Sequence, residues 1–222
     1  MTNLSLPSGA LPPGIEAAWA GVPEADEALL TEAERARRVT FGSADRRLQF
    51  TLGRTVARRL AGRRLGVPPV EVPLRLGADG APEVEGLCVS IAHGGRGGEA
   101  VAAAAVADGP VGVDVEAIVP RQEDLWDRIL APEEVGVRDA LGGHSTEALT
   151  LVWSLKEAVL KGQRTGLRAG ARSVRLVLDA DGVSEAGTAS AVSARSGSWL
   201  LRFCRLGGVW VTVAWPDAVP GR

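Results

Sequence analysis

The stretch WSLKEAVLKG, residues 153–162, contains the only two lysines of the chain, Lys156 and Lys161. It lies at the end of a segment in which apolar residues recur at the spacing of one helix face: Leu149, Val152, Leu155 and Val159. The pattern predicts a helix from about 146 to 161, ended by Gly162 as a C′ glycine. This helix lies between two groups of predicted strands.

The segments before this helix predict helices followed by strands. Helices are expected at 31–39, where Thr31 and Glu34 form a capping-box pattern, and from Ser43 to about Leu65, ended at Gly66. Residues 1–23 are rich in Pro and Gly and are expected to be irregular. Strands are expected at 71–76, 87–92, 100–107 and 111–118.

The same order then starts again, with a short helix at 122–130, the helix at 146–161 and strands at 173–179, 199–206 and 209–215. The last two strands are expected to pair as a hairpin across Gly207-Gly208. The sequence therefore predicts an α+β fold with two similar lobes, residues 1–110 and 111–222.

Composition excludes several classes of protein. The formal net charge of −2 gives no overall field toward nucleic acid or a membrane. Ten arginines between residues 35 and 64 could form a nucleic-acid patch, but acidic residues lie among them. No apolar run approaches the roughly 20 residues that span a bilayer, and no signal peptide is recognised. A soluble, cytoplasmic protein with two reduced cysteines, Cys88 and Cys204, is expected.

In the predicted strand VGVDVEAI, residues 111–118, valines alternate with glycine and acidic residues. Its valines are expected in the core, which places Gly112, Asp114 and Glu116 together on the opposite face. Two neighbouring carboxylates are either solvated or bridged by a hard cation, for which Mg²⁺ is the expected ion. Gly112 would leave room on that face for a close approach.

On the 146–161 helix, Trp153, Glu157 and Lys161 form a second stripe at intervals of four residues. Glu157 and Lys161 could be an ordinary solvated ion pair, worth a few tenths of a kcal/mol. The large aromatic Trp153 favours a partly buried setting instead. There, Glu157 could supply a third carboxylate or act as a general base, and Lys161 could bind a phosphate. A third feature, His93 in the glycine-rich turn SIAHGG, could bind an anion.

These three motifs, in this order, resemble the Sfp-type 4′-phosphopantetheinyl transferase family. The resemblance rests on SIAHGG, VGVDVE and WSLKEAVLKG and extends over residues 30 to 215. It implies two α+β lobes in a pseudo-twofold arrangement with the active site between them, and a monomer as the default state. The implied reaction transfers 4′-phosphopantetheine from coenzyme A to a serine of an acyl or peptidyl carrier protein, releasing 3′,5′-ADP.

The resemblance also implies roles for particular residues. It implies that Mg²⁺ is held by three carboxylates: Asp114, Glu116 and Glu157. Glu157 would also be the base for the carrier serine, and Lys161 would contact the pyrophosphate. Other contacts to coenzyme A are implied for His93, Arg35, Arg54 and Lys156.

Two positions depart from the family pattern: Ala81 replaces a basic residue and Ala92 precedes His93, where a hydroxyl side chain is usual. They leave open an alternative, a catalytically weakened relative that binds a carrier protein or nucleotide in an accessory role.

Overall fold

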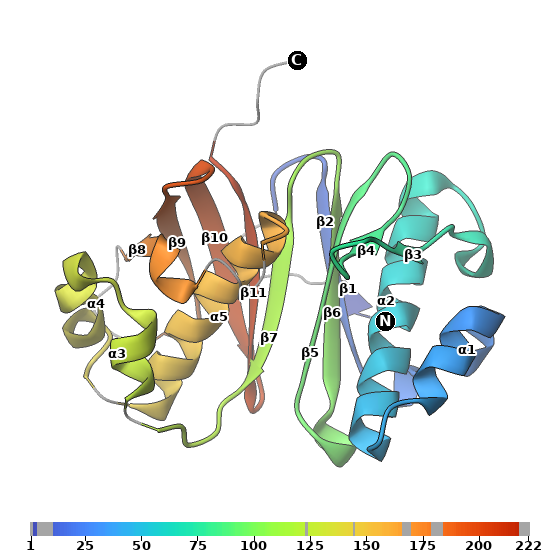
Figure 1. Ribbon diagram of the computed structural model, residues 1–222, viewed down its shortest axis with the longest axis horizontal. Coiled ribbons are helices and arrows are strands. Elements are labelled where there is room, and N and C mark those ends of the chain that lie inside the picture. The colour runs from blue at the N-terminus through green and yellow to red at the C-terminus, as the bar shows by residue number, and fades with distance from the viewer. Residues whose placement is uncertain are drawn as a thin grey trace. The chain divides into compact units, whose positions relative to one another are not determined.

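A computed structural model describes residues 2–3, 11–122, 124–143, 145–165, 170–178 and 184–217. The fold is mixed α and β, with several sheets (Figure 1). The chain divides into two compact units, whose described residues are those up to Gly109 and those from Pro110 on.

The first unit is built on an antiparallel sheet with strand order β1-β2-β6-β5. Helix α2 packs along β2, β5 and β6, as Figure 1 shows for β5 and β6. The bounds of the elements are α1 Glu32–Val39, α2 Ala44–Leu65, β1 Thr2–Asn3, β2 Ile15–Gly21, β5 Cys88–Gly94 and β6 Val101–Ala107, with a small ribbon of β3 Arg75–Leu76 and β4 Pro82–Glu83. The core between α2 and the sheet pairs large helix residues with small strand residues, such as Leu52 with the alanines of β6.

Both predicted helices of this unit are confirmed, including their caps. Thr31 accepts a hydrogen bond from the backbone N–H of Glu34, whose carboxylate in turn accepts from the Thr31 N–H. Ser43 caps α2, and Gly66 ends it in the left-handed region, at φ 70°. A glycine is suited to this conformation because it lacks a Cβ.

Two predictions in this unit are wrong. Residues 15–21, expected to be irregular, form β2 and pair with β6 from Ile15–Ala107 to Gly21–Val101. Their alanine-rich sequence carries little β-branched signal, so tertiary pairing decides the conformation. The expected strand at 71–76 is reduced to Arg75–Leu76, preceded by a 3₁₀ turn at Pro69–Glu71. Pro73 has no N–H to offer a sheet there.

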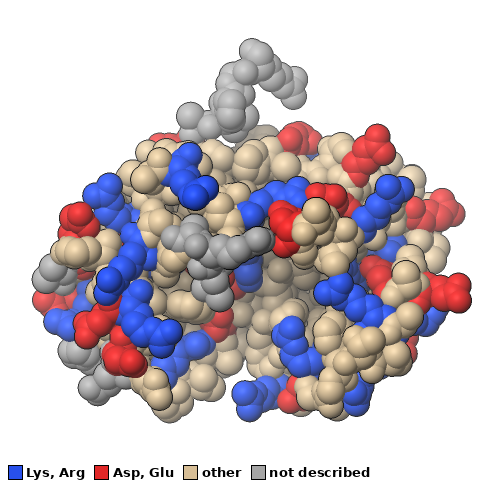
Figure 2. All heavy atoms as spheres, viewed as in Figure 1, with Lys and Arg blue, Asp and Glu red and all other residues tan. Residues whose placement is uncertain are grey.

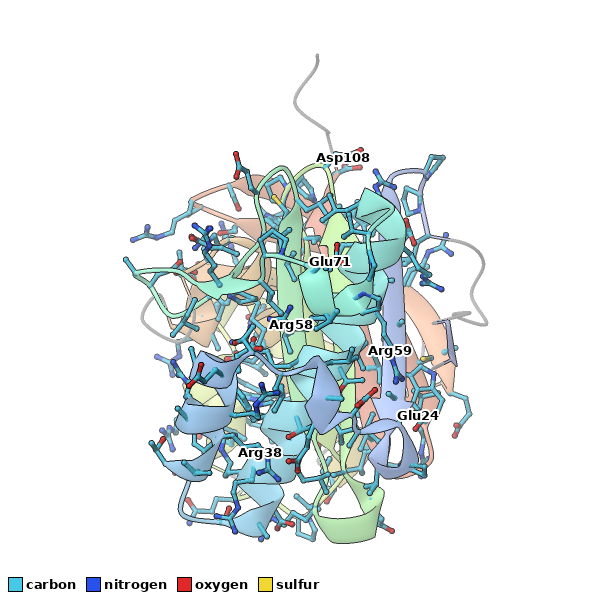
Figure 3. The ribbon with its side chains drawn as sticks, turned by 90° about the vertical axis from the view of Figure 1, so that its right-hand side faces the viewer. Glu24, Arg38, Arg58, Arg59, Glu71 and Asp108 are labelled. Atoms are coloured by element: carbon cyan, nitrogen blue, oxygen red, sulfur yellow. The ribbon has the colours of Figure 1, made fainter. Side chains whose placement is uncertain are left out.

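Many arginines of the first unit have acidic partners within it. Arg58 lies 2.9 Å from Glu34 Oε2 and donates to the carbonyl of Val72, and it is 1% exposed. Figure 3 labels Arg58 together with Arg38 and Arg59, which extend from α1 and α2. On the face seen in Figure 2, basic and acidic side chains are interspersed. The described residues include no helix long and apolar enough to cross a membrane.

The second unit has a five-stranded antiparallel sheet with strand order β7-β11-β10-β9-β8. Helix α5 lies on one face of this sheet and contacts β7, β11, β10 and β8 (Figure 1). The bounds are β7 Gly112–Ala117, α3 Leu125–Ile129, α4 Val135–Ala140, α5 Thr146–Gly162, β8 Val174–Val177, β9 Ala186–Ser193, β10 Gly197–Leu206 and β11 Val209–Pro216. The predicted hairpin is confirmed, since β10 and β11 pair up to Leu206–Val209.

The end of α5 differs from its prediction. Gly162 is the last residue of the helix and is not a left-handed C′ residue, since its φ is not positive, and Gln163 after it is right-handed too. A Cβ on Gly162 would lie 2.6 Å from the ring of Trp199, so the glycine is required by packing. Strand β9 has no counterpart in the prediction, because its sequence AGTASAVS is small and polar.

Candidate active site

Strand β7 presents Gly112, Asp114 and Glu116 to helix α5. A Cβ on Gly112 would lie 1.8 Å from the carbonyl oxygen of Ala158, so the helix backbone lies directly against the strand at this point. The expected close approach at Gly112 is therefore made by α5 itself. Val113, on the other face, is fully buried. The two carboxylates of β7 consequently lie beneath a helix.

The stripe of α5 that carries Trp153, Glu157 and Lys161 faces this strand. The Nζ of Lys161 lies 2.6 Å from Asp114 Oδ1, and Trp153 Nε1 donates to Glu116 Oε1 at 2.9 Å. The ion partner of Lys161 is thus Asp114 on β7, where the sequence suggested Glu157 of the same helix. Five polar and aromatic side chains from two elements are brought together.

Two carboxylate oxygens of the group have no hydrogen-bond partner among the described residues: Asp114 Oδ2 and Glu157 Oε1. Both are buried, in side chains of residues that are 2% and 8% exposed. A buried carboxylate oxygen without a donor costs free energy unless a cation or a proton compensates it. The site therefore has unfilled capacity for positive charge.

Burial makes Glu157 and Glu116 hold their protons more tightly. Burial raises the pKa of Glu157 to about 7, with the charge of Asp114 adding to the effect and Lys161 opposing it. Burial, and then the charge of Asp114, also raises the pKa of Glu116, while Arg121 and Trp153 oppose the rise. For Lys161, burial disfavours the charged form, but Asp114, Glu157 and Glu116 together outweigh it and the pKa is raised.

These residues fit a hard divalent cation in their chemistry. Mg²⁺ prefers carboxylate oxygens, a few of which it combines with water and phosphate oxygens. The group offers three carboxylates with two uncompensated oxygens. Within the described part of the chain, no three acidic, cysteine or histidine side chains are already gathered as a metal site. Binding a cation would therefore require these side chains to rearrange.

Lys156, expected to contact coenzyme A, lies away from this group, and that prediction is corrected. Its side chain is fully buried, and its Nζ lies 2.6 Å from Glu134 Oε2 and 2.6 Å from the carbonyl of Val174. Burial lowers the pKa of Lys156, against the pull of Glu134. Its ammonium is committed to neighbours within the second unit, which leaves no donor face for a ligand.

The remaining predicted residues belong to the first unit. His93 is half-buried on β5, opposite Ala102 in register, and strand alternation places it on the face of Ile91, next to α2. Arg35 donates to backbone carbonyls, including that of Leu30. His144, expected in a loop, lies outside the described residues.

Arg54, the other arginine of the prediction, is 8% exposed and lies over the ring of Phe50, at 5.2 Å. Its Nη1 has no partner among the described residues. Burial lowers the pKa of the guanidinium, an effect that Glu34 opposes and Arg58 reinforces. The guanidinium of Arg54 therefore has a donor left for a ligand.

Two residues of the second unit were missed by sequence reasoning. Arg121 donates to Glu116 Oε2, so both oxygens of Glu116 have N–H partners. The sequence shows only that Arg121 stands five residues after Glu116. It lies in a loop, where no helix or strand spacing predicts which side chains meet. Glu134, the partner of Lys156, gave no signal, since it lies in an acidic run typical of a solvated turn.

Comparison with known proteins adds one finding. Residues 110–213 match the family model of the 4′-phosphopantetheinyl transferase superfamily. The match includes β7, α5 and the acidic group between them, and it supports a transferase of this general kind without distinguishing the Sfp-type subfamily. No curated protein matches the chain significantly.

Proposed function

We propose that this protein transfers the 4′-phosphopantetheine group of coenzyme A to a serine hydroxyl of an acyl or peptidyl carrier protein, as an Sfp-type enzyme. The observation that carries the proposal is the group of Asp114, Glu116, Glu157 and Lys161, which lies within the residues matched to the superfamily. Its buried carboxylate oxygens lack a hydrogen-bond donor, and a bound cation would compensate their charge. Its lysine is partly exposed and could bind a phosphate.

The proposed roles follow from burial and charge. Asp114, Glu116 and Glu157 would hold Mg²⁺, which when bound would neutralise charge on the pyrophosphate of coenzyme A. Lys161 would supply a second positive charge to the same phosphates. Without the cation the pKa of Glu157 is about 7, and a bound cation would lower it, so the carboxylate is unprotonated and available as the base at neutral pH.

In the transfer step, the serine oxygen forms a bond to the phosphorus that carries pantetheine. The bond between that phosphorus and the bridging oxygen of the pyrophosphate breaks, and 3′,5′-ADP leaves with the electron pair. The proton of the serine hydroxyl passes to Glu157, directly or through water. We also propose that His93, Arg35 and Arg54 bind phosphates of coenzyme A. The protein is further proposed to be a cytoplasmic monomer with two similar lobes.

A second candidate is an accessory protein that binds a carrier protein or nucleotide without transferring the group. The observations in its favour are the replacements at Ala81 and Ala92, which remove two polar contacts expected in an active member. The acidic group argues against it, since binding alone needs no buried carboxylate with a raised pKa.

The deciding experiment is the intact mass of an apo carrier protein after incubation with coenzyme A, Mg²⁺ and this protein. We expect a mass increase of one phosphopantetheine, abolished by a chelator and restored by Mg²⁺ or Mn²⁺. Asp114→Ala should give no increase, because it removes a metal ligand and the partner of Lys161. A carrier protein that is bound but unchanged in mass would favour the accessory role.

A further inference from the structure

The second lysine of α5 forms a buried ion pair of its own. Lys156 and Glu134 have side chains that are 0% and 2% exposed, and their charged atoms lie 2.6 Å apart. Glu134 Oε2 also accepts from the N–H of Ala131, and Oε1 accepts from the N–H of Leu176, each at 2.7 Å. The pair is therefore fully hydrogen-bonded, the condition under which a buried ion pair is tolerated.

This pair completes the free edge of the sheet in the second unit. Strand β8 is the last in the order β7-β11-β10-β9-β8 and pairs only with β9. The N–H of Leu176 is donated to Glu134 and not to β9, and the carbonyl of Val174, two residues earlier, faces the same side of the strand. Lys156 donates to the carbonyl and Glu134 accepts from the N–H, so the two side chains replace a neighbouring strand.

Helix α5 is thereby fastened to both edges of one sheet. Lys161 ties it to β7 through Asp114, and Lys156 ties it to β8 through the Val174 carbonyl and Glu134. The two lysines are five residues apart, so they point about 140° apart around the helix axis. Two such ties, on opposite sides, fix how far the helix can rotate about its own axis.

We propose that Glu134 and Lys156 are positioning residues, which hold the rotation of α5 that directs Glu157 and Lys161 toward β7. Lys156 adjoins Glu157 in sequence, so a small rotation at one moves the other. The kinetic part of this inference rests on the proposed transferase function. The metal-binding part depends only on the acidic group.

The test uses Glu134→Gln, Lys156→Met and the double variant, all close in size to the native side chains. The double variant removes both charges and so leaves no unpaired buried charge if a single variant fails to fold. Phe203→Leu is the matched control, since it perturbs the same buried core at the ring of Trp210 and touches neither lysine. Each variant is assayed well below its own melting temperature, for kcat, for KM toward coenzyme A and for Mn²⁺ affinity by electron paramagnetic resonance.

We expect the pair variants to lose roughly 10- to 100-fold in kcat with little change in KM, because small misplacement of a reacting group is costly. Their affinity for Mn²⁺ should fall by about tenfold or more, the typical effect of losing an outer support of metal ligands. Phe203→Leu should lower the melting temperature and change neither quantity. Folded pair variants with native kcat and Mn²⁺ affinity would overturn the proposal, as would equal losses in Phe203→Leu.

The two proposals fail in different ways. If the wild-type protein binds Mn²⁺ but transfers nothing, the proposed function is wrong, and the Mn²⁺ affinities alone decide the positioning role. A wild-type protein that neither binds Mn²⁺ nor transfers the group would overturn both.

Discussion

Among single side chains, Lys161 shows how position as well as charge can matter. Its ammonium lies 2.6 Å from Asp114 and its side chain is 30% exposed, so it can meet a ligand. Lys161→Arg keeps the charge but replaces a compact ammonium with a planar fork. We expect a folded protein with an unchanged melting temperature that loses most of its transferase activity. Near-native kcat/KM in this variant would mean that only the charge is needed.

The raised pKa of Glu157 predicts a dependence of stability on pH. The pKa is about 7 in the folded protein against an ordinary 4.5, so the folded state binds this proton more tightly than the unfolded chain. The resulting stabilisation is fully present below pH 4.5 and is lost as pH rises through 7. It amounts to at most about 3 kcal/mol.

Urea unfolding in metal-free buffer at pH 5.5 and pH 8 measures this effect. Glu157→Gln, which stays neutral at every pH, should reduce the fall in stability between the two conditions. An equal fall in the variant would assign the dependence to other groups. A bound cation would lower the pKa of Glu157, so transferase activity in Mg²⁺ should rise with pH over a range below 7, where the base loses its proton.

For the elements, the tight contact between β7 and α5 is the feature most open to a test. Gly112→Ala would place a Cβ 1.8 Å from the Ala158 carbonyl, so the strand or the helix must move. We expect a loss of about 1–3 kcal/mol in the free energy of unfolding, typical of overpacking. Gly98→Ala, where a Cβ meets nothing within 4 Å, is the control. Equal stability of the two variants would contradict the observed packing.

The spacing of apolar residues predicted most helices and strands, but it did not predict which element packs against each face. The alternation in β7 correctly separated the valines from the carboxylates, yet it could not show that α5 covers the carboxylate face. The helical stripe correctly grouped Trp153, Glu157 and Lys161, because helix geometry fixes their common direction. Lys156 was assigned to the same site through its place in the motif. Its true partner, Glu134, is 22 residues away in sequence, and only the tertiary structure brings the two together.

For the whole molecule, metal binding should appear as added stability. A ligand that binds only the folded state raises the free energy of unfolding by RT ln(1 + [L]/Kd), about 2.7 kcal/mol at a hundredfold excess over Kd. We expect Mg²⁺ to raise the melting temperature of the wild-type protein in a concentration-dependent way. Asp114→Ala should remove most of this shift, and a shift that survives the substitution would place the cation elsewhere.

The unequal burial of the two lysines also makes the protein a selective substrate for amine chemistry. In the folded state the ammonium of Lys156 is fully enclosed, whereas the side chain of Lys161 is 30% exposed. Of the two lysines, only Lys161 should therefore be acylated, at a pH high enough to deprotonate an ammonium whose pKa is raised beside Asp114. Peptide mass spectrometry distinguishes this adduct from one on the α-amino group. A fluorophore or cross-linker attached through lysine would then report from the candidate active site, without any engineered residue.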